Sequence, residues 1–169
     1  MTNQYDDVMR MLFDVARMSH DTSTQNAAVL LDENGNIIFE TLCVNSAPEG
    51  VQMTPDRLER PAKYFYTEHA ERNVIYSAAR EGIKTDGLTL VAIWASCADC
   101  ARAVIRSGIN QLVRYDIGAP AHWSASIDAA DEMYAEAEIK IINISTPYDV
   151  NPILHNGKLW LTTSVPPMN

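Results

Sequence analysis

The 169-residue chain lacks any apolar run that approaches the roughly 20 residues of a membrane-spanning helix. Residues 1–7 are polar and acidic, and they have neither the basic start nor the apolar stretch of a secretory signal. We therefore expect a cytoplasmic protein without a membrane partner.

Basic residues are also scarce, with 13 Lys and Arg against 22 Asp and Glu and a formal net charge of −9. Proteins that bind along nucleic acid depend largely on Lys and Arg that neutralise phosphates. A nucleic-acid partner is therefore disfavoured, and a small-molecule ligand is the better expectation. A local basic patch can still bind one phosphate, because net charge does not set the field inside a cleft.

Cysteine occurs only three times. Two of the cysteines form the segment Cys97-Ala98-Asp99-Cys100, whose spacing favours a metal or redox site over a structural disulfide in a chain without a secretory signal. Cys43 lies in an apolar run, where we expect it to pack as a small buried residue.

Apolar periodicity and turn residues predict the secondary structure. Helices are expected at residues 5–19, 68–81, 97–106 and 124–138, and strands at residues 27–32, 37–44, 88–95, 111–115 and 140–144. The first two strands flank Asn34-Gly35, a tight-turn sequence, so we expect them to pair antiparallel. Prolines interrupt residues 45–66, which are expected to form an irregular loop and one wall of a binding site. The segment after Pro147 carries no clear pattern.

The order of these elements predicts the fold class. The length favours a single domain over residues 1–169, and helices alternating with strands after an initial hairpin indicate an α/β fold. We expect three layers, with a mixed sheet of about five strands flanked by helices. Trp94 falls in a run that is expected to be buried on both faces, which places it in the core. Ser96 is expected to cap the helix that begins at Cys97.

Two motifs at predicted helix starts combine into a candidate metal site. His69 begins one helix, and Cys97 and Cys100 begin another. Three protein ligands leave a zinc ion an open fourth position for water, and helix N-termini favour thiolates. Glu71 is too close along the chain to pair with His69 as a ligand on one helix face, so we expect it to carry protons.

Two other kinds of site were considered for the cysteine pair. A thioredoxin-like redox site would not need His69-Ala70-Glu71 at the start of a separate helix. A purely structural zinc site would need a fourth protein ligand, and the remaining histidines have no motif support for that role. These histidines are His20, His122 and His155.

The pattern resembles the His-x-Glu and Pro-Cys-x-x-Cys signature of the zinc-dependent cytidine and deoxycytidylate deaminase superfamily. The likeness extends over residues 16–116 and is greater to the deoxycytidylate deaminases, as residues 19–25, 63–66 and 100–109 show. It implies a cytidine deaminase-like fold, a pyrimidine nucleotide as substrate and a homo-oligomer. Deoxycytidine monophosphate (dCMP) is the expected substrate, deaminated hydrolytically to dUMP and ammonia.

The resemblance also implies roles for individual residues. His69, Cys97 and Cys100 would bind Zn²⁺, and Glu71 would protonate the ring nitrogen and then the departing ammonia. Three further residues are expected at the substrate: the Asn45 side chain, the Ala70 backbone amide at the pyrimidine carbonyl, and Tyr66 as a wall for the base.

Two departures from the family pattern bear on these expectations. Ser96 stands where the signature has proline, and we expect the zinc site to survive because serine also starts helices well. Ser46 stands where many regulated deoxycytidylate deaminases have glycine, which argues against regulation by triphosphates. Arg57, Arg60 and Lys63 form a small basic cluster that suits either a phosphate or a solvated surface.

Several alternatives remain open at this point. The substrate could instead be free cytidine or deoxycytidine, a 5-modified dCMP, guanine, or adenosine in transfer RNA, the last disfavoured by the acidic charge balance. A zinc-stabilised but inactive binding subunit is the non-enzymatic alternative, against which the presence of Glu71 argues.

Overall fold

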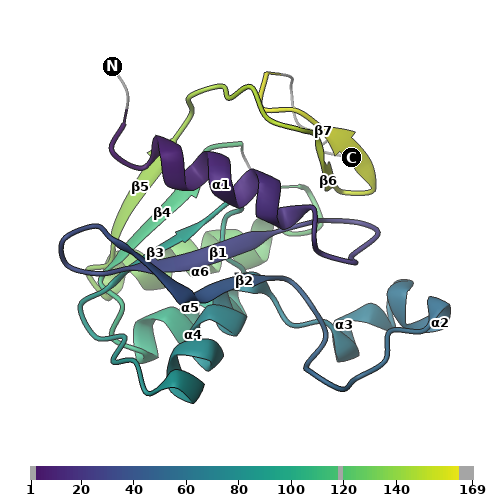
Figure 1. Ribbon diagram of the computed structural model, residues 1–169, viewed down its shortest axis with the longest axis horizontal. Helices are drawn as coiled ribbons and strands as arrows, with labels where there is room; N and C mark the ends of the chain where they lie inside the picture. The colour runs from purple at the N-terminus through teal and green to yellow at the C-terminus, as the bar shows by residue number, and fades with distance from the viewer. Residues whose placement is uncertain (1–2, 118–119, 164–169) are drawn as a thin grey trace.

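A mixed sheet of five strands forms the centre of the molecule (Figure 1). The computed structural model describes residues 3–117 and 120–163. The strand order is β2-β1-β3-β4-β5. The strands are β1 (Ala27–Leu31), β2 (Ile37–Val44), β3 (Thr89–Ala92), β4 (Gln111–Tyr115) and β5 (Lys140–Ile144).

The sheet is antiparallel on one side and parallel on the other. Strand β1 pairs antiparallel with both β2 and β3, whereas β3 with β4 and β4 with β5 are parallel. The parallel pairs need crossover connections, and helices supply them. The longer helices are α1 (Asp6–Ala16), α4 (Ala70–Glu81), α5 (Ala98–Arg106) and α6 (Ser124–Glu136).

Alternate residues of the strands face two separate cores, which gives the three layers seen in Figure 1. Helix α1 covers one face, where Phe13 packs with Val29 and Val91. Helices α4, α5 and α6 cover the other face, where Leu30 packs with Val74. The predicted α/β class, with three layers and a mixed five-stranded sheet, is therefore confirmed.

The structure differs from the sequence prediction in residues 45–66 and after Pro147. Residues 45–66 contain two one-turn helices, α2 (Pro55–Leu58) and α3 (Lys63–Tyr66), within the expected loop. After Pro147 the chain forms a hairpin of β6 (Ile153–His155) and β7 (Lys158–Trp160), which no sequence pattern had indicated.

In the ranges that the structure describes, no helix is both long and apolar enough to cross a membrane.

The start of α5 also differs from the prediction. Cys97 is the N-cap residue, with φ −76° and ψ 168°, so Ser96 lies one position too early to cap the helix. The Ser96 side chain is fully buried and interacts with the Tyr134 side chain. Instead, the Ala98 amide donates a hydrogen bond of 3.0 Å to Ser126 Oγ from α6, so a neighbouring helix supplies the cap.

Candidate active site

Three potential metal ligands converge where α4 and α5 begin. His69 is the N-cap of α4 and Cys97 is the N-cap of α5. His69 Nδ1 lies 3.6 Å from Cys97 Sγ and 3.4 Å from Cys100 Sγ, and the two sulfurs lie 3.5 Å apart. Tetrahedral zinc places sulfur and nitrogen ligands about 3.5 to 3.8 Å from one another. The three observed separations lie at or just below these values, so the side chains are close enough together to bind one zinc ion.

The cluster leaves one position of a tetrahedral ion open. Across residues 3–117 and 120–163, this trio is the one group of histidine, cysteine or carboxylate side chains close enough to share a metal. His20, His122 and His155 do not join it. A site with three protein ligands and a free corner is typical of catalytic rather than structural zinc.

The surroundings of the trio favour the thiolate at Cys97 alone, whereas the hydrogen bond with Cys97 and then burial raise the pKa of Cys100. A hydrogen bond with Cys100 lowers the pKa of Cys97 to about 3, burial opposes this, and His69 contributes further lowering. Burial alone would lower the pKa of His69, but Cys97 and Glu71 raise it above its ordinary value. The shared hydrogen bonds and charges therefore make the Cys97 thiolate available at neutral pH.

An arginine that the sequence interpretation missed contacts both sulfurs. Arg72 Nη1 lies 3.2 Å from Cys100 Sγ and 3.8 Å from Cys97 Sγ. Glu68 Oε1 accepts hydrogen bonds from Arg72 Nε at 2.5 Å and from the His69 amide at 3.0 Å. Burial would lower the pKa of Arg72, but Cys100 and Glu68 raise it. The guanidinium therefore stays charged and can balance the thiolates.

Glu71 lies in the first turn of α4, beside the trio. It is 2% exposed, and burial raises its pKa above the ordinary value for a glutamate. Asn26 Nδ2 donates a hydrogen bond of 3.2 Å to Glu71 Oε2. A carboxyl group with a raised pKa next to a metal site suits proton transfer near neutral pH.

A cavity opens in front of these groups, and His69, Glu71 and Cys97 form part of its wall. Aromatic rings make up much of the remaining wall, as expected for a site that holds a flat ring. The aromatic lining residues are Tyr64, Trp94, His122, Trp123 and His155. The Trp123 ring centroid lies 5.9 Å from that of His69, in an edge-to-face arrangement. Trp94 thus belongs both to the core, as predicted, and to the cavity wall.

The β6–β7 hairpin closes one side of the cavity. Two backbone hydrogen bonds fix it to the loop before β1, from Gln25 to Leu154 at 2.9 Å and from Gly157 to Ser23 at 2.7 Å. The His155 ring lies 4.5 Å from the Trp94 ring. These contacts join parts of the chain that are far apart in sequence, which explains why local sequence patterns did not indicate them.

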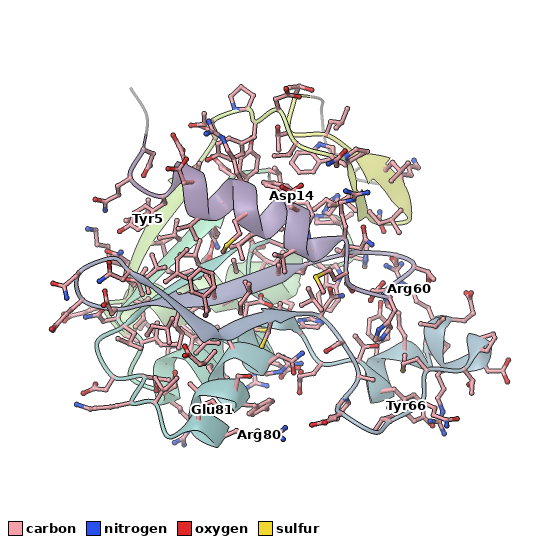
Figure 2. All side chains as sticks on the ribbon, viewed as in Figure 1. Tyr5, Asp14, Arg60, Tyr66, Arg80 and Glu81 are labelled. Atoms are coloured by element: carbon pink, nitrogen blue, oxygen red, sulfur yellow. The ribbon has the colours of Figure 1, made fainter. Side chains whose placement is uncertain are left out.

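The three predicted substrate residues, Asn45, Ala70 and Tyr66, differ in their position relative to the cavity. Asn45 lines the cavity, and Ala70 is the fully buried first residue of α4. Tyr66, labelled in Figure 2, is not among the lining residues, and its ring lies 4.3 Å from the Arg57 guanidinium. Tyr64 lines the cavity instead. Residues two apart on a helical turn point in nearly opposite directions, so only one of the two tyrosines can face the cavity.

The three residues of the basic cluster, Arg57, Arg60 and Lys63, lie in different surroundings. Lys63 is buried, and its Nζ lies 2.8 Å from the Asp21 carboxylate, which neutralises it. Arg57 stacks on Tyr66 outside the cavity lining. Arg60, labelled in Figure 2, lines the cavity and donates a hydrogen bond of 2.7 Å to Ser23 Oγ.

Comparison with known proteins agrees with this geometry. Residues 2–115 match the family model described as the cytidine and deoxycytidylate deaminase zinc-binding region. The chain is 29% identical over 129 residues to an uncharacterized deaminase from the luxG 3′ region of Aliivibrio fischeri, covering 75% of this chain and 84% of that protein.

Two further similarities concern phage enzymes. The deoxycytidylate deaminase of Enterobacteria phage T2 is 37% identical over 79 residues, a match that covers 45% of this chain and 38% of the phage enzyme. The crystal structure of the dCMP deaminase from cyanophage S-TIM5, in complex with dCMP and dUMP, superposes with a TM-score of 0.66. That match has 17% identity and covers 85% of this chain and 99% of the cyanophage chain, so it shows a shared fold. This chain belongs to the cytidine and deoxycytidylate deaminase family.

Proposed function

We propose that this protein hydrolyses the 4-amino group of a cytosine nucleotide, with dCMP as its preferred substrate and Zn²⁺ as its cofactor. The observation that carries the proposal is a buried Glu71 beside the cluster of His69, Cys97 and Cys100, in a cavity whose wall contains several aromatic rings. Matches to two phage deoxycytidylate deaminases support the choice of dCMP.

The chain's own residues supply the proton transfers. His69, Cys97 and Cys100 would hold the zinc ion, which, when bound, makes water nucleophilic at neutral pH. Glu71 would take one proton from the attacking water and deliver it to the ring nitrogen, and it would then move the second proton of the same oxygen to the amino group, which departs as ammonia. Its raised pKa places the carboxyl group closer to neutral pH, where it can both accept and donate a proton.

Binding of the base would use the cavity wall and the start of α4. The rings of Tyr64 and Trp123, whose centroids lie 6.2 Å apart in an edge-to-face arrangement, form an apolar wall against which a pyrimidine can pack. The first amides of a helix lack partners within the helix, so the Ala70 amide is suited to bind the pyrimidine carbonyl. Asn45 lines the same cavity, and its side-chain Oδ1 already accepts a hydrogen bond from the Asn26 main-chain amide at 2.8 Å. That oxygen keeps a second lone pair for a substrate hydroxyl.

Charge at the cavity supports a phosphorylated substrate. Arg60 lines the cavity without a carboxylate partner among the described residues, unlike Lys63. His122 lines it too, and its pKa is lowered by burial and then by the positive charges of Arg60 and Lys63. Because Asp21 neutralises Lys63, the charge of Arg60 would attract the 5′-phosphate of dCMP.

The test is ammonia release from cytosine, cytidine, deoxycytidine and their monophosphates. We expect kcat/KM to be highest for dCMP, and Arg60→Gln to raise KM for dCMP at least tenfold while leaving deoxycytidine unaffected. Arg57→Gln is the matched control and should change neither value, because Arg57 lies outside the lining. Equal rates with and without the phosphate would refute the nucleotide preference.

A homo-oligomeric state, a single domain and a cytoplasmic location stay predictions.

A further inference from the structure

The amide of Asn26 contacts the carboxylate that the proposed reaction requires. Asn26 directly precedes β1, is 7% exposed and lines the cavity. In the part of the chain that the structure describes, its Nδ2 makes the one side-chain hydrogen bond to Glu71, at 3.2 Å. We propose that Asn26 is a positioning residue, which holds one carboxylate oxygen of Glu71 so that the other faces the reacting atoms.

Stability alone does not account for this asparagine. The Asn26 Oδ1 atom is buried and has no hydrogen-bond partner among the described residues. A buried acceptor without a partner destabilises the folded state, and an apolar side chain of similar size would avoid that loss. The Asn26 side chain thus keeps its Nδ2 contact to Glu71 although its Oδ1 lacks a partner, which indicates that the contact serves the reaction rather than the fold.

The main chain at Asn26 is held independently of its own side chain. The Asn26 amide donates to Asn45 Oδ1 at 2.8 Å, and the Asn45 amide donates to the Asn26 carbonyl at 3.2 Å. Asn45 Nδ2 is fixed in turn by the Thr24 carbonyl at 2.8 Å and by Asp21 at 3.3 Å. A substitution at position 26 therefore removes the contact to Glu71 while the strand start stays in place.

Holding one oxygen has a chemical consequence for the other. Asn26 occupies Oε2 of Glu71, which assigns proton transfer to Oε1. A carboxylate that can rotate freely spends less time in the productive geometry, and a displacement of about 1 Å can reduce a rate by about 10²-fold. Loss of the Asn26 amide should therefore lower turnover without weakening substrate binding.

The experiment rests on the proposed function and compares Asn26→Leu with the wild type. The wild-type rate of ammonia release from dCMP, measured first, tests the proposed function by itself. The ratio of variant to wild type then tests Asn26, using any cytosine compound that the wild type deaminates. We expect kcat to fall about 10- to 100-fold, with KM, dUMP affinity and zinc content within twofold of the wild type and a thermal midpoint within a few degrees.

Asn73→Leu is the matched control. Asn73 Nδ2 donates to the Val44 carbonyl at 2.9 Å and to Ser46 Oγ at 3.2 Å, close to the same strand end but without contact to Glu71. This variant should lower the thermal midpoint and leave kcat within twofold. If Asn26→Leu does not fold, Asn26→Ala removes the same donor without added bulk. A kcat within twofold of wild type, or a parallel loss of kcat, dUMP affinity and zinc, would overturn the proposal.

Discussion

The buried ion pair between Lys63 and Asp21 gives a quantitative test of how the cavity wall is held. Their side chains are 8% and 5% exposed, and the N–O distance is 2.8 Å. Asp21 Oδ1 also accepts hydrogen bonds from the amides of Ser23 at 2.7 Å and Thr24 at 2.9 Å. The pair thus joins α3 to the loop before β1, and both segments line the cavity.

Removing one partner should leave an uncompensated buried charge. We expect Lys63→Met to lower the free energy of unfolding by about 3 to 5 kcal/mol. With a urea m-value of about 1 to 3 kcal/mol per molar, the unfolding midpoint should fall by roughly 1 to 5 M. Urea unfolding followed by circular dichroism at fixed zinc concentration measures this shift.

The double variant distinguishes a paired charge from simple loss of packing. Asp21→Asn combined with Lys63→Met leaves no buried charge, so it should be less destabilised than the two single changes added together, by about 0.5 to 3 kcal/mol. The exposed pair Arg80–Glu49 is the control: its N–O distance is 2.9 Å, but its side chains are 73% and 82% exposed. Arg80→Met should cost less than about 1 kcal/mol. Additive single effects at Asp21 and Lys63 would refute the reasoning.

Four further outcomes are expected. Glu71→Gln should lower kcat by about 10²- to 10⁴-fold while metal analysis finds unchanged zinc, and unchanged turnover would refute its proton role. Arg72→Met should weaken zinc binding about 10- to 100-fold in chelator competition, because its contacts to the two sulfurs are lost; equal affinity would contradict this. Burial raises the pKa of Glu71, and Glu71 must be ionised to accept a proton. As pH falls, kcat should therefore decline with an apparent pKa above the ordinary glutamate value of about 4.3. An apparent pKa at or below that value would contradict the assigned role of Glu71. Phe13→Ala should cost about 3 to 5 kcal/mol in urea unfolding, since Phe13 is 1% exposed in the core, and a loss under about 1 kcal/mol would contradict that packing.

The sequence predicted the metal trio because each ligand lies in a short motif at a helix start. His69 and Cys97 are both N-cap residues, and the two helices cover the same face of the sheet, which brings the motifs together. Local patterns also predicted the five central strands, because alternation and turn residues act over a few positions. The mixed character of the sheet followed from the hairpin and the alternating helices and strands, but the order of the strands was not predicted.

Other parts of the site depend on contacts that no local pattern encodes. The choice between Tyr64 and Tyr66 depends on which side of a one-turn helix faces the cavity. Asn26 and Arg72 become informative only once Glu71 and Cys100 are placed beside them from distant segments. Ser96 was a reasonable cap by residue type, but the helix began one residue later than expected.

The β6–β7 hairpin completes a cavity wall that is otherwise built from residues much earlier in the chain. The family match ends at residue 115, yet His155 and Asn156 from this hairpin form part of the cavity wall. The trio and Glu71 thus lie inside the matched stretch, whereas part of the wall around them comes from beyond it. A substitution in the hairpin can therefore reshape the cavity without touching His69, Cys97, Cys100 or Glu71.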